Sequence, residues 1–172
     1  MTVEDIFAKL TSLLPDSGLE LLSNAPEAII VVPRDTIREV SLTLRDDTDF
    51  GFQSMTCLTG IERGGGLEVA YSLFSNKLKK HINLKVKVSY EDANIPTVAD
   101  IWRTADWHER EAFDMFGFTF VGHPDHRRML CPDDWEGHPL RKDYQPPLFF
   151  HDIPVTVNVP GGTASPAVRP GA

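Results

Sequence analysis

The chain has 172 residues, of which 41% are hydrophobic and 24% charged, as in an ordinary soluble globular protein. We expect one domain, because this length supplies a core that is stable without disulfides or metal ions. The formal net charge of −8 argues against general nucleic-acid binding, which requires a basic surface. The two cysteines, Cys57 and Cys131, are too few for an iron–sulfur cluster held by this chain alone. They fit a reducing compartment, although their number also allows one disulfide.

The sequence contains no membrane or targeting signal of an ordinary kind. No apolar run approaches the roughly 20 residues that span a bilayer. The first ten residues include two acidic side chains and no arginine, unlike a signal or transit peptide. We therefore expect a protein that is made where it works.

The N-terminal part of the chain predicts a helix, a strand and a second helix. Thr2 and Asp5 suggest an N-cap, and the helix that follows has its apolar side chains at helical spacing: Val3, Ile6, Phe7, Leu10 and Leu14. Residues 28–32 are apolar and rich in β-branched side chains, which favours a strand. A second helix is expected from about Asp35 as its N-cap. Its inward side chains should be Ile37, Val40, Ser41 and Leu44.

The central part of the chain predicts three consecutive strands, at residues 50–58, 67–74 and 82–90. In the third strand apolar residues alternate strictly with polar ones, which indicates one buried and one wet face. Residues 64–66 are three glycines that form a turn between strands; they lack the spacing and the lysine of a phosphate-binding loop. Residues 75–80 should form the next hairpin. This pattern favours an antiparallel sheet covered by helices on one side.

A third helix is expected over residues 100–116. Ala105, Ala112, Phe113 and Phe116 form its apolar stripe, which places a polar set on the opposite side: Trp107, Arg110, Glu111 and Asp114. Arg110 and Asp114 are one turn apart and can pair. Gly117 is placed to end the helix in a left-handed conformation. Residues 118–121 then predict a short strand, and residues 122–125 a turn.

These elements predict an α+β fold: a mostly antiparallel or mixed sheet with helices packed on one face, followed by an irregular C-terminal loop and an extended tail. We divide the chain into an α/β globular domain (1–121), a charged His/Arg/Asp-rich docking loop (122–153) and a Pro/Gly-rich tail (154–172). The tail should be ordered only where something else holds it. The polar loop needs its own hydrogen-bond network or a partner surface, because apolar burial alone cannot fold it.

Two metal or nucleophile hypotheses involve the loop histidines. A zinc site is conceivable from a set of potential ligands: His123, His126, His138, His151, Asp125 and Cys131. No CxxC or HExxH accompanies them, and loop histidines are more often hydrogen-bonding or surface residues. Cys131 with His126 or His138 resembles a nucleophile–base pair, but a proline follows it and no oxyanion-hole motif is visible. Burial as a small hydrophobe is the commoner role of a free cysteine.

Two further hypotheses concern the third helix. Glu109, Glu111 and Asp114 are candidates for general acid–base work, but side by side with Arg110 they more often mark a salt-bridged surface. Trp107 and Trp135 with nearby arginines are of the types that anchor protein–protein contacts. An interaction surface is therefore the competing interpretation.

Several motifs from Glu109 to Tyr144 resemble one known family. They are Glu109-Arg110-Glu111, Asp114-Met115-Phe116-Gly117, His123-Pro124-Asp125, Arg127-Arg128-Met129-Leu130 and the run Asp133-Asp134-Trp135-Glu136-Gly137-His138-Pro139-Leu140-Arg141-Lys142-Asp143-Tyr144. The family is that of the C subunit (30 kDa subunit) of the proton-pumping NADH-quinone oxidoreductase, respiratory complex I. The first hundred residues match it in pattern rather than in motif. His126 stands where leucine is usual, and Cys57 where a small polar or acidic residue is usual.

The resemblance implies a non-catalytic subunit of the peripheral arm, on the cytoplasmic side of the energy-conserving membrane. No catalytic, cofactor or metal residues are implied in this chain; FMN and iron–sulfur clusters belong to partner subunits, and quinone is the substrate of the complex. The implied partners are the D (49 kDa-type) subunit beside the quinone site, other hydrophilic subunits (B and I) and, indirectly, the membrane arm. The expected interface residues are Trp107, Arg110, Glu111, Asp114, His123, Arg127, Arg128, Trp135, Arg141, Lys142, Asp143 and Tyr144.

Two alternatives to this assignment stay open. A similar module occurs in membrane-bound nickel–iron hydrogenases and in deazaflavin-linked dehydrogenases, in some of which it is fused to the large subunit. A different class is an independent hydrolase built on the loop histidines, which predicts activity from the isolated chain.

Overall fold

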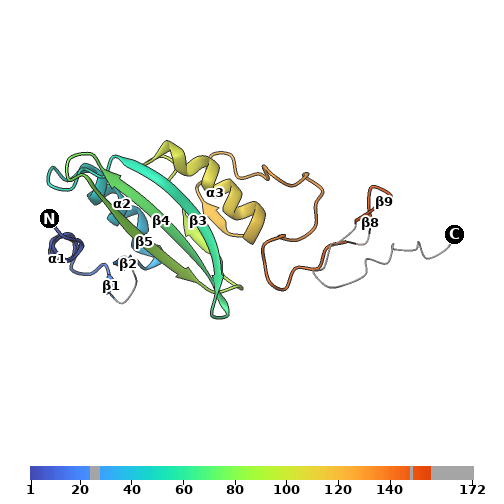
Figure 1. Cartoon of the computed structure of the whole chain (residues 1–172), viewed down its shortest axis with the longest axis horizontal. Coiled ribbons are helices and arrows are strands. Elements are labelled where there is room, and N and C mark those ends of the chain that lie inside the picture. Colours follow the sequence, from blue (N-terminus) through green and yellow to red (C-terminus); the bar gives the residue numbers. More distant parts are fainter. Residues whose placement is uncertain (24–27, 148, 156–172) are drawn as a thin grey trace.

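The computed structural model describes residues 1–23, 28–147 and 149–155 of the chain. Five strands form the main sheet, in the order β1-β2-β5-β4-β3 (Figure 1). They are β1 (Glu20–Leu22), β2 (Ile29–Val31), β3 (Ser54–Arg63), β4 (Gly66–Ser75) and β5 (Lys80–Val88). Neighbouring strands are antiparallel except β2 and β5, which are parallel. The α+β class and the mixed sheet predicted from the sequence are confirmed.

Within the described residues, three α-helices accompany the sheet: α1 (Val3–Leu13), α2 (Ile37–Asp46) and α3 (Arg103–Phe116). A capping box between Thr2 and Asp5 begins α1, as predicted. The helix α2 follows a 3-10 turn, η1 (Arg34–Thr36). The predicted N-cap at Asp35 is wrong, because the N-cap position of α2 is Thr36 and no side chain caps this helix. All four predicted inward residues of α2 are buried.

The core lies between the helices and one face of the sheet. The alternation predicted for the third strand is visible in β5, and β4 has the same pattern. The core-facing residues of both strands are fully or almost fully buried: Leu67, Val69, Tyr71, Leu73, Ile82, Leu84 and Val86. The other face carries polar pairs, including Ser72 with Asn83 and Glu68 with Lys85. Lys85 departs from the predicted wet face, because its ammonium group lies 2.8 Å from the Glu68 carboxylate and its side chain is largely covered.

A second, two-stranded parallel sheet positions the end of α3. It pairs β6 (Asn94–Pro96) with β7 (Thr119–Val121), one before and one after the helix. Gly117 ends α3 with φ +79°, a left-handed conformation that glycine adopts without strain, as predicted. The chain therefore turns back after α3 and brings residues 123–126 alongside the helix, with His123 next to Asp106 in its first turn.

Strand bounds and strand pairing differ from the sequence predictions in several places. The strand expected at 50–58 begins at Ser54 and continues to Arg63, and β1 was not predicted at all. A purely antiparallel arrangement is excluded by the parallel pairing of β2 with β5. The parallel pairing of β2 with β5 was missed because pairing between distant segments leaves no trace in local periodicity.

Beyond β7 the chain leaves the sheet as an extended loop, which carries the small hairpin of β8 (Phe149–Phe150) and β9 (Ile153–Pro154) (Figure 1). We call residues 122–147 the C-terminal loop. The predicted tail lies outside the described residues except at 154 and 155, and the domain boundaries at 121 and 153 stay predictions. Within the described ranges, no helix has the length and hydropathy that a membrane crossing requires.

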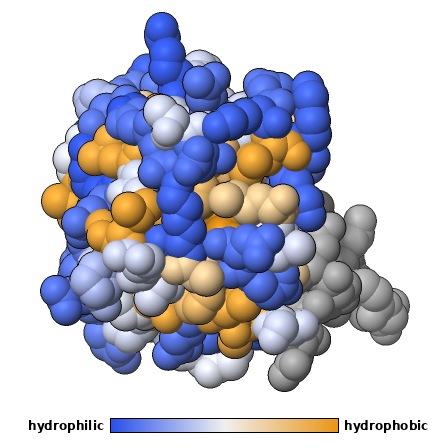
Figure 2. All heavy atoms as spheres, turned by 90° about the vertical axis from the view of Figure 1, so that its left-hand side faces the viewer, coloured by the Kyte–Doolittle hydropathy of each residue, from blue (hydrophilic) through white to orange (hydrophobic). Residues whose placement is uncertain are grey.

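The opposite end of the molecule, which carries α1, has an ordinary mixed surface. Figure 2 shows hydrophobic patches there that hydrophilic side chains separate from one another. Leu13 of α1 is among the exposed apolar residues, whereas Phe7 packs partly against the core. The charged and histidine-rich part of the chain lies away from this end, on α3 and in the C-terminal loop.

Candidate functional site: the end of α3 and the C-terminal loop

The C-terminal loop is attached to the last turn of α3 by hydrogen bonds to the main-chain carbonyls of the helix. An α-helix leaves its last four carbonyl groups without partners inside the helix. Here the carbonyls of residues 113–116 accept, in turn, from Gly117 N at 2.8 Å, His138 Nδ1 at 3.1 Å, Leu140 N at 3.1 Å and Arg141 Nε at 2.5 Å. The loop thus completes the helix, and three of the four donors come from residues 138–141.

Asp114 is the second point of attachment, and its carboxylate is fully buried. Its Oδ2 accepts hydrogen bonds from the amides of Met129, Leu130 and Cys131 at 3.2, 2.8 and 2.8 Å. Its Oδ1 accepts from Arg128 Nη1 at 2.6 Å. Burial alone would raise the pKa of this carboxyl, but the amides and the guanidinium outweigh burial and hold the pKa below its ordinary value.

Arg110 is the third point of attachment. Its guanidinium donates to the carbonyls of Arg127 and Arg128 at 3.3 and 3.4 Å and lies 3.5 Å from the Asp125 carboxylate. It also lies 5.3 Å from the ring centre of Trp107, within range of a cation–π contact. The predicted pair of Arg110 with Asp114 is therefore wrong: each side chain binds a different part of the loop.

Glu109 is buried beneath the turn that follows β7. Its carboxylate accepts a hydrogen bond from Thr97 Oγ1 and one from Val98 N at 2.8 Å. Burial raises the pKa of Glu109 to about 7, although both hydrogen bonds act in the other direction. The prediction that Glu109, Glu111 and Asp114 form a salt-bridged surface is wrong for Glu109 and Asp114, which are fully buried; Glu111 alone is exposed.

The loop histidines make separate hydrogen bonds to the protein. His138 contacts the carbonyl of Asp114, and His151 contacts the Asp134 carboxylate at 2.5 Å. His123 accepts a hydrogen bond from the amide of Asp125 in the turn after β7, and His126 accepts one from the amide of Phe120 in β7 itself. In the part of the chain that the structure describes, no three His, Cys, Asp or Glu side chains are grouped as ligands for a metal ion. Burial, followed by the charge of Asp114, raises the pKa of the Cys131 thiol, which disfavours the thiolate that a nucleophile requires.

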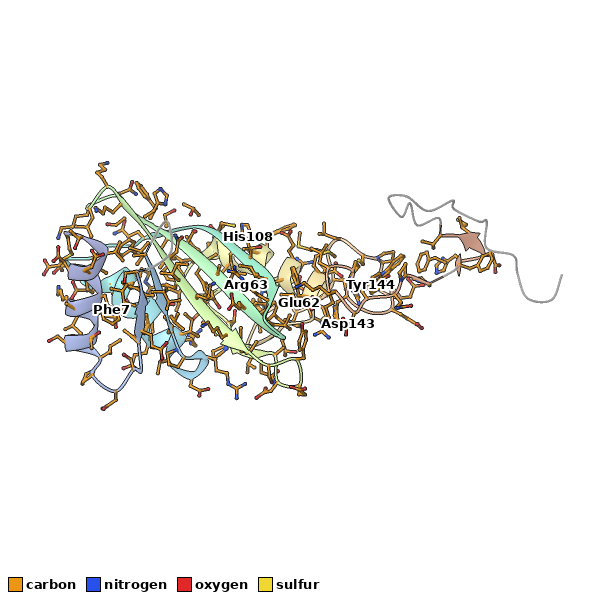
Figure 3. All side chains as sticks on the ribbon, turned by 60° about the horizontal axis from the view of Figure 1, so that its bottom comes forward. Phe7, Glu62, Arg63, His108, Asp143 and Tyr144 are labelled. Atoms are coloured by element: carbon orange, nitrogen blue, oxygen red, sulfur yellow. The ribbon has the colours of Figure 1, made fainter. Side chains whose placement is uncertain are left out.

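A fourth contact joins the loop to the main sheet. Glu62, near the end of β3, accepts from Lys142 N at 2.6 Å and also from the Tyr90 hydroxyl. Figure 3 shows Glu62 at this junction with Asp143 and Tyr144 beside it, whereas Phe7 lies at the far end of the molecule. Sequence reasoning missed Glu62 and Tyr90, because a partner 80 residues away leaves no local signal.

The predicted interface residues thus divide into two groups. Those that hold the loop against α3 or line its inner side are Arg110, Asp114, His123, Arg128 and Arg141. Those that are wholly or partly open to solvent are Trp107, Glu111, Arg127, Trp135, Lys142, Asp143 and Tyr144. Trp135 packs on Phe150 at a ring distance of 4.9 Å.

The anchored loop leaves large apolar side chains outside. Trp107, Leu130 and Leu140 are 61%, 59% and 56% exposed. Leu140 also borders a groove of about 250 Å³ between β3 and α3, whose other lining residues include Leu58, His108, Glu111 and Met115. Neither local periodicity nor motif spacing indicated Leu130 and Leu140 as exposed, since both lie in irregular chain.

Comparison with known proteins places the chain in a family. The family model described as the 30 kDa subunit of respiratory-chain NADH dehydrogenase matches residues 30–148. Curated relatives named as the C subunit of NADH-quinone oxidoreductase are similar: that of Chloroherpeton thalassium is 50% identical over 123 residues (70% of this chain, 51% of the relative). That of Chlorobium phaeobacteroides is 44% identical over 128 residues (73% and 77%), and that of Roseiflexus castenholzii 38% identical over 156 residues (89% and 88%). The chain therefore spans about half of the first relative and most of the other two.

Two solved structures share the fold. A trypsin-resistant fragment (1–134) of Nqo5 aligns with a TM-score of 0.59 and 27% identity, over 73% of this chain and 99% of the fragment. A chain of the membrane-bound sulfane sulfur reductase, an archaeal respiratory membrane complex, aligns with a TM-score of 0.69 and 27% identity, over 83% of this chain and 85% of that one. With the family model covering more than half of its length, this chain belongs to the family of the 30 kDa subunit of respiratory-chain NADH dehydrogenase.

Proposed function

We propose that this chain is a non-catalytic subunit of the peripheral arm of a proton-translocating NADH-quinone oxidoreductase. Its role is to dock on the D subunit and so support assembly of the electron-transfer arm next to the quinone site. Family membership supports the complex, and the geometry supports the docking. The observation that carries the proposal is the way the C-terminal loop is held. Asp114 and the end of α3 bind its inner side, while large apolar side chains are exposed to solvent.

The physical argument for docking rests on preorganisation. A partner that binds a mobile loop loses affinity to the entropy of ordering it. Here the carboxylate of Asp114, the capped carbonyls of α3 and the Glu62 junction already fix the loop. Trp107 is of the residue type that most often dominates an interface, and Leu140 continues the apolar surface beside the groove.

In this proposal the chain contributes to the chemistry of the complex only by positioning other subunits. We propose that FMN, iron–sulfur clusters and quinone are bound by partner subunits, B and I among them, and that the assembly lies on the cytoplasmic side of its membrane. No catalytic, cofactor or metal site in this chain is part of the proposal. Measured NADH:quinone activity should therefore depend on this subunit only through assembly.

A second candidate function comes from the resemblance to the chain of the sulfane sulfur reductase complex. It is the equivalent subunit of a related membrane-bound complex, such as a nickel–iron hydrogenase or a deazaflavin-linked dehydrogenase. The docking geometry would be the same in both cases. The companion subunits distinguish the two candidates.

The first experiment is purification of the tagged native chain from its own membranes in mild detergent, with mass spectrometry of its partners and an NADH:quinone assay. Co-elution with flavin and cluster subunits together with activity supports the first candidate. Hydrogenase or deazaflavin subunits in their place support the second. A chain that elutes alone contradicts both.

Exposed-residue variants test the docking surface itself. Trp107→Ala with Leu140→Ala should lower recovery of the D subunit about tenfold or more, because truncating such anchors costs about 1–2 kcal/mol or more at an interface. The matched control is Leu42→Ala on α2, an exposed leucine away from this surface. Truncation at Tyr144 combined with Arg141→Ala should also prevent assembly. Unchanged assembly in both cases would refute the docking.

A further inference from the structure

Two histidines hold the turn after β7 through ring nitrogens that accept hydrogen bonds. His123 Nδ1 accepts from the amide of Asp125 at 3.0 Å, and His126 Nε2 accepts from that of Phe120 at 3.1 Å. An imidazole nitrogen accepts a hydrogen bond only while it carries no proton of its own. Both contacts therefore require neutral rings, and in each ring the proton lies on the other nitrogen.

The surroundings of His123 place the proton of the neutral ring on Nε2. The side chain is fully buried, and Nε2 lies 3.1 Å from the carbonyl of Asp106, to which it donates. The carboxylates of Asp106 and Glu109 follow at 3.4 and 3.9 Å from the same nitrogen. A second proton would have to bind at Nδ1, where it would point at the N–H of Asp125 and replace the hydrogen bond by a repulsive contact between two donors.

The surroundings of His126 are mainly aromatic. Its ring lies 4.2 Å from Phe113, 6.4 Å from Phe120 and 5.9 Å from His123 between centres. Burial is the first cause that lowers the pKa of His126, and the neighbouring His123 acts in the same direction. A proton on Nε2 would again meet an amide N–H, in this case that of Phe120.

We propose that His123 and His126 are a pair of pH-sensitive clips, which hold the turn of residues 120–127 closed over α3 when neutral and release it when protonated. The sign follows from the contacts. Protonation converts both acceptors into donors that face backbone N–H groups, so the closed turn is favoured at neutral pH and lost in acid. Because burial lowers the pKa of His126, the contribution of His126 to closure is complete above the ordinary histidine pKa of 6.5 and is lost as the pH falls through the lower value.

Charged neighbours act on the two clips differently. Around His123, the carboxylates of Asp106 on α3 and Asp125 in the turn lie close to the ring, and Arg110 partly neutralises Asp125. Glu109 carries little charge below its pKa of about 7. Around His126 the packed groups are the two phenyl rings and His123, which offer no anion. The inference concerns the chain's own conformation and does not depend on the proposed docking.

The test is NMR-detected amide exchange on the full chain between pH 7.5 and 5.5, expressed as protection factors so that the intrinsic pH dependence of exchange cancels. The amides of Asp125 and Phe120 should lose about tenfold protection, the equivalent of one hydrogen bond. The amide of Thr119 is an internal control, because its partner is the carbonyl of Ala93 at 2.9 Å and no histidine is involved. Its protection should stay constant.

The matched variant replaces both clips with acceptors that do not titrate. In His123→Asn the amide oxygen lies near the position of Nδ1, and in His126→Gln near that of Nε2. Protection at Asp125 and Phe120 should then no longer depend on pH, whereas His81→Gln on β5 should behave like the wild type. Constant wild-type protection, or pH dependence that persists in the double variant, would overturn the proposal.

A direct measurement covers the case in which the double variant does not fold. Nitrogen NMR of the wild-type rings should show His123 protonated at Nε2 and His126 at Nδ1 at pH 7.5. Double protonation should coincide with the loss of amide protection. Rings that stay neutral at pH 5.5 while the turn opens would refute the clips.

Discussion

Arg128 reaches from the C-terminal loop to the buried Asp114 of α3, with Nη1 2.6 Å from Oδ1, while its Nη2 donates to the carbonyl of Gly137 at 2.9 Å. One guanidinium therefore joins the helix to both halves of the loop. The carboxylate that it neutralises is fully buried and also accepts hydrogen bonds from three amides. This charge is stabilised only while the loop is in place.

Asp114→Asn should destabilise the chain by about 3–5 kcal/mol, the usual cost of removing one partner from a buried ion pair. The amide keeps the shape of the carboxylate but removes the charge and turns an NH₂ group toward one of its donors. Urea denaturation measures the change, with Glu111→Gln as the control, because that residue is exposed on the same helix. Equal midpoints for the two variants would show that the Asp114 anchor contributes little to stability.

Gly117→Ala should be more harmful than Gly65→Ala, although both residues have a positive φ of about 80°. At Gly65 an added Cβ meets no atom within 4 Å, so only backbone strain of about 1 kcal/mol is expected. At Gly117 the Cβ would lie 2.6 Å from the His138 ring and 2.8 Å from Arg141 Nη2, which displaces two caps of α3. A total of about 3 kcal/mol is expected by thermal or urea unfolding. Equal losses would mean that the two caps contribute nothing.

Glu109→Gln should change the pH dependence of stability. The pKa of Glu109 is raised from 4.5 to about 7 by burial, so the stability that it supplies is complete below pH 4.5 and is lost as the pH rises through 7. The free energy of unfolding of the wild type should therefore fall by about 3 kcal/mol relative to the variant between these limits. The difference between the two proteins is the quantity to measure, because it cancels the opposite effect of the histidines. A constant difference from pH 4.5 to 7.5 is incompatible with this assignment.

Glu62→Ala should loosen the loop from the sheet without unfolding either. The variant removes the acceptor for the Lys142 amide and for the Tyr90 hydroxyl. Hydrogen exchange at Lys142 should become about tenfold faster, while amides in β3 and β4 keep their protection. Arg63→Ala, at the next and exposed position, is the control. Exchange at Lys142 that is as slow as in the wild type would assign the anchoring to other contacts.

Periodicity predicted the local parts of the fold well. Signals within a few residues predicted the N-cap at Thr2, the inward side of α2, the hairpins that join β3, β4 and β5, and the left-handed Gly117. It did not predict β1 or the parallel pairing of β2 with β5, which joins segments more than fifty residues apart. Such pairing depends on tertiary packing, which a single sequence does not display.

In the candidate site, too, local patterns did not predict contacts with distant parts of the chain. Charged residues on a helix are normally assigned to its solvent side, and this rule placed Glu109, Arg110 and Asp114 outside. They are buried, because amides and carbonyls from residues 97–98 and 127–131 surround them. No helical pattern encodes partners that arrive from a later loop. The density of polar motifs indicated that the loop needs its own hydrogen-bond network or a partner surface, and the structure shows a network within this chain.

The capped end of α3 also has a consequence for how the chain comes apart. Because residues 138–141 supply the donors for three of the last four carbonyls, the final turn of the helix and the loop share one opening transition. A protease cut within residues 128–137 would leave the helix covalently intact and yet weaken its end, since the donors would then be tethered only by noncovalent contacts. A cut in this loop would therefore first destabilise the C-terminal turn of α3, which precedes the loop in the chain.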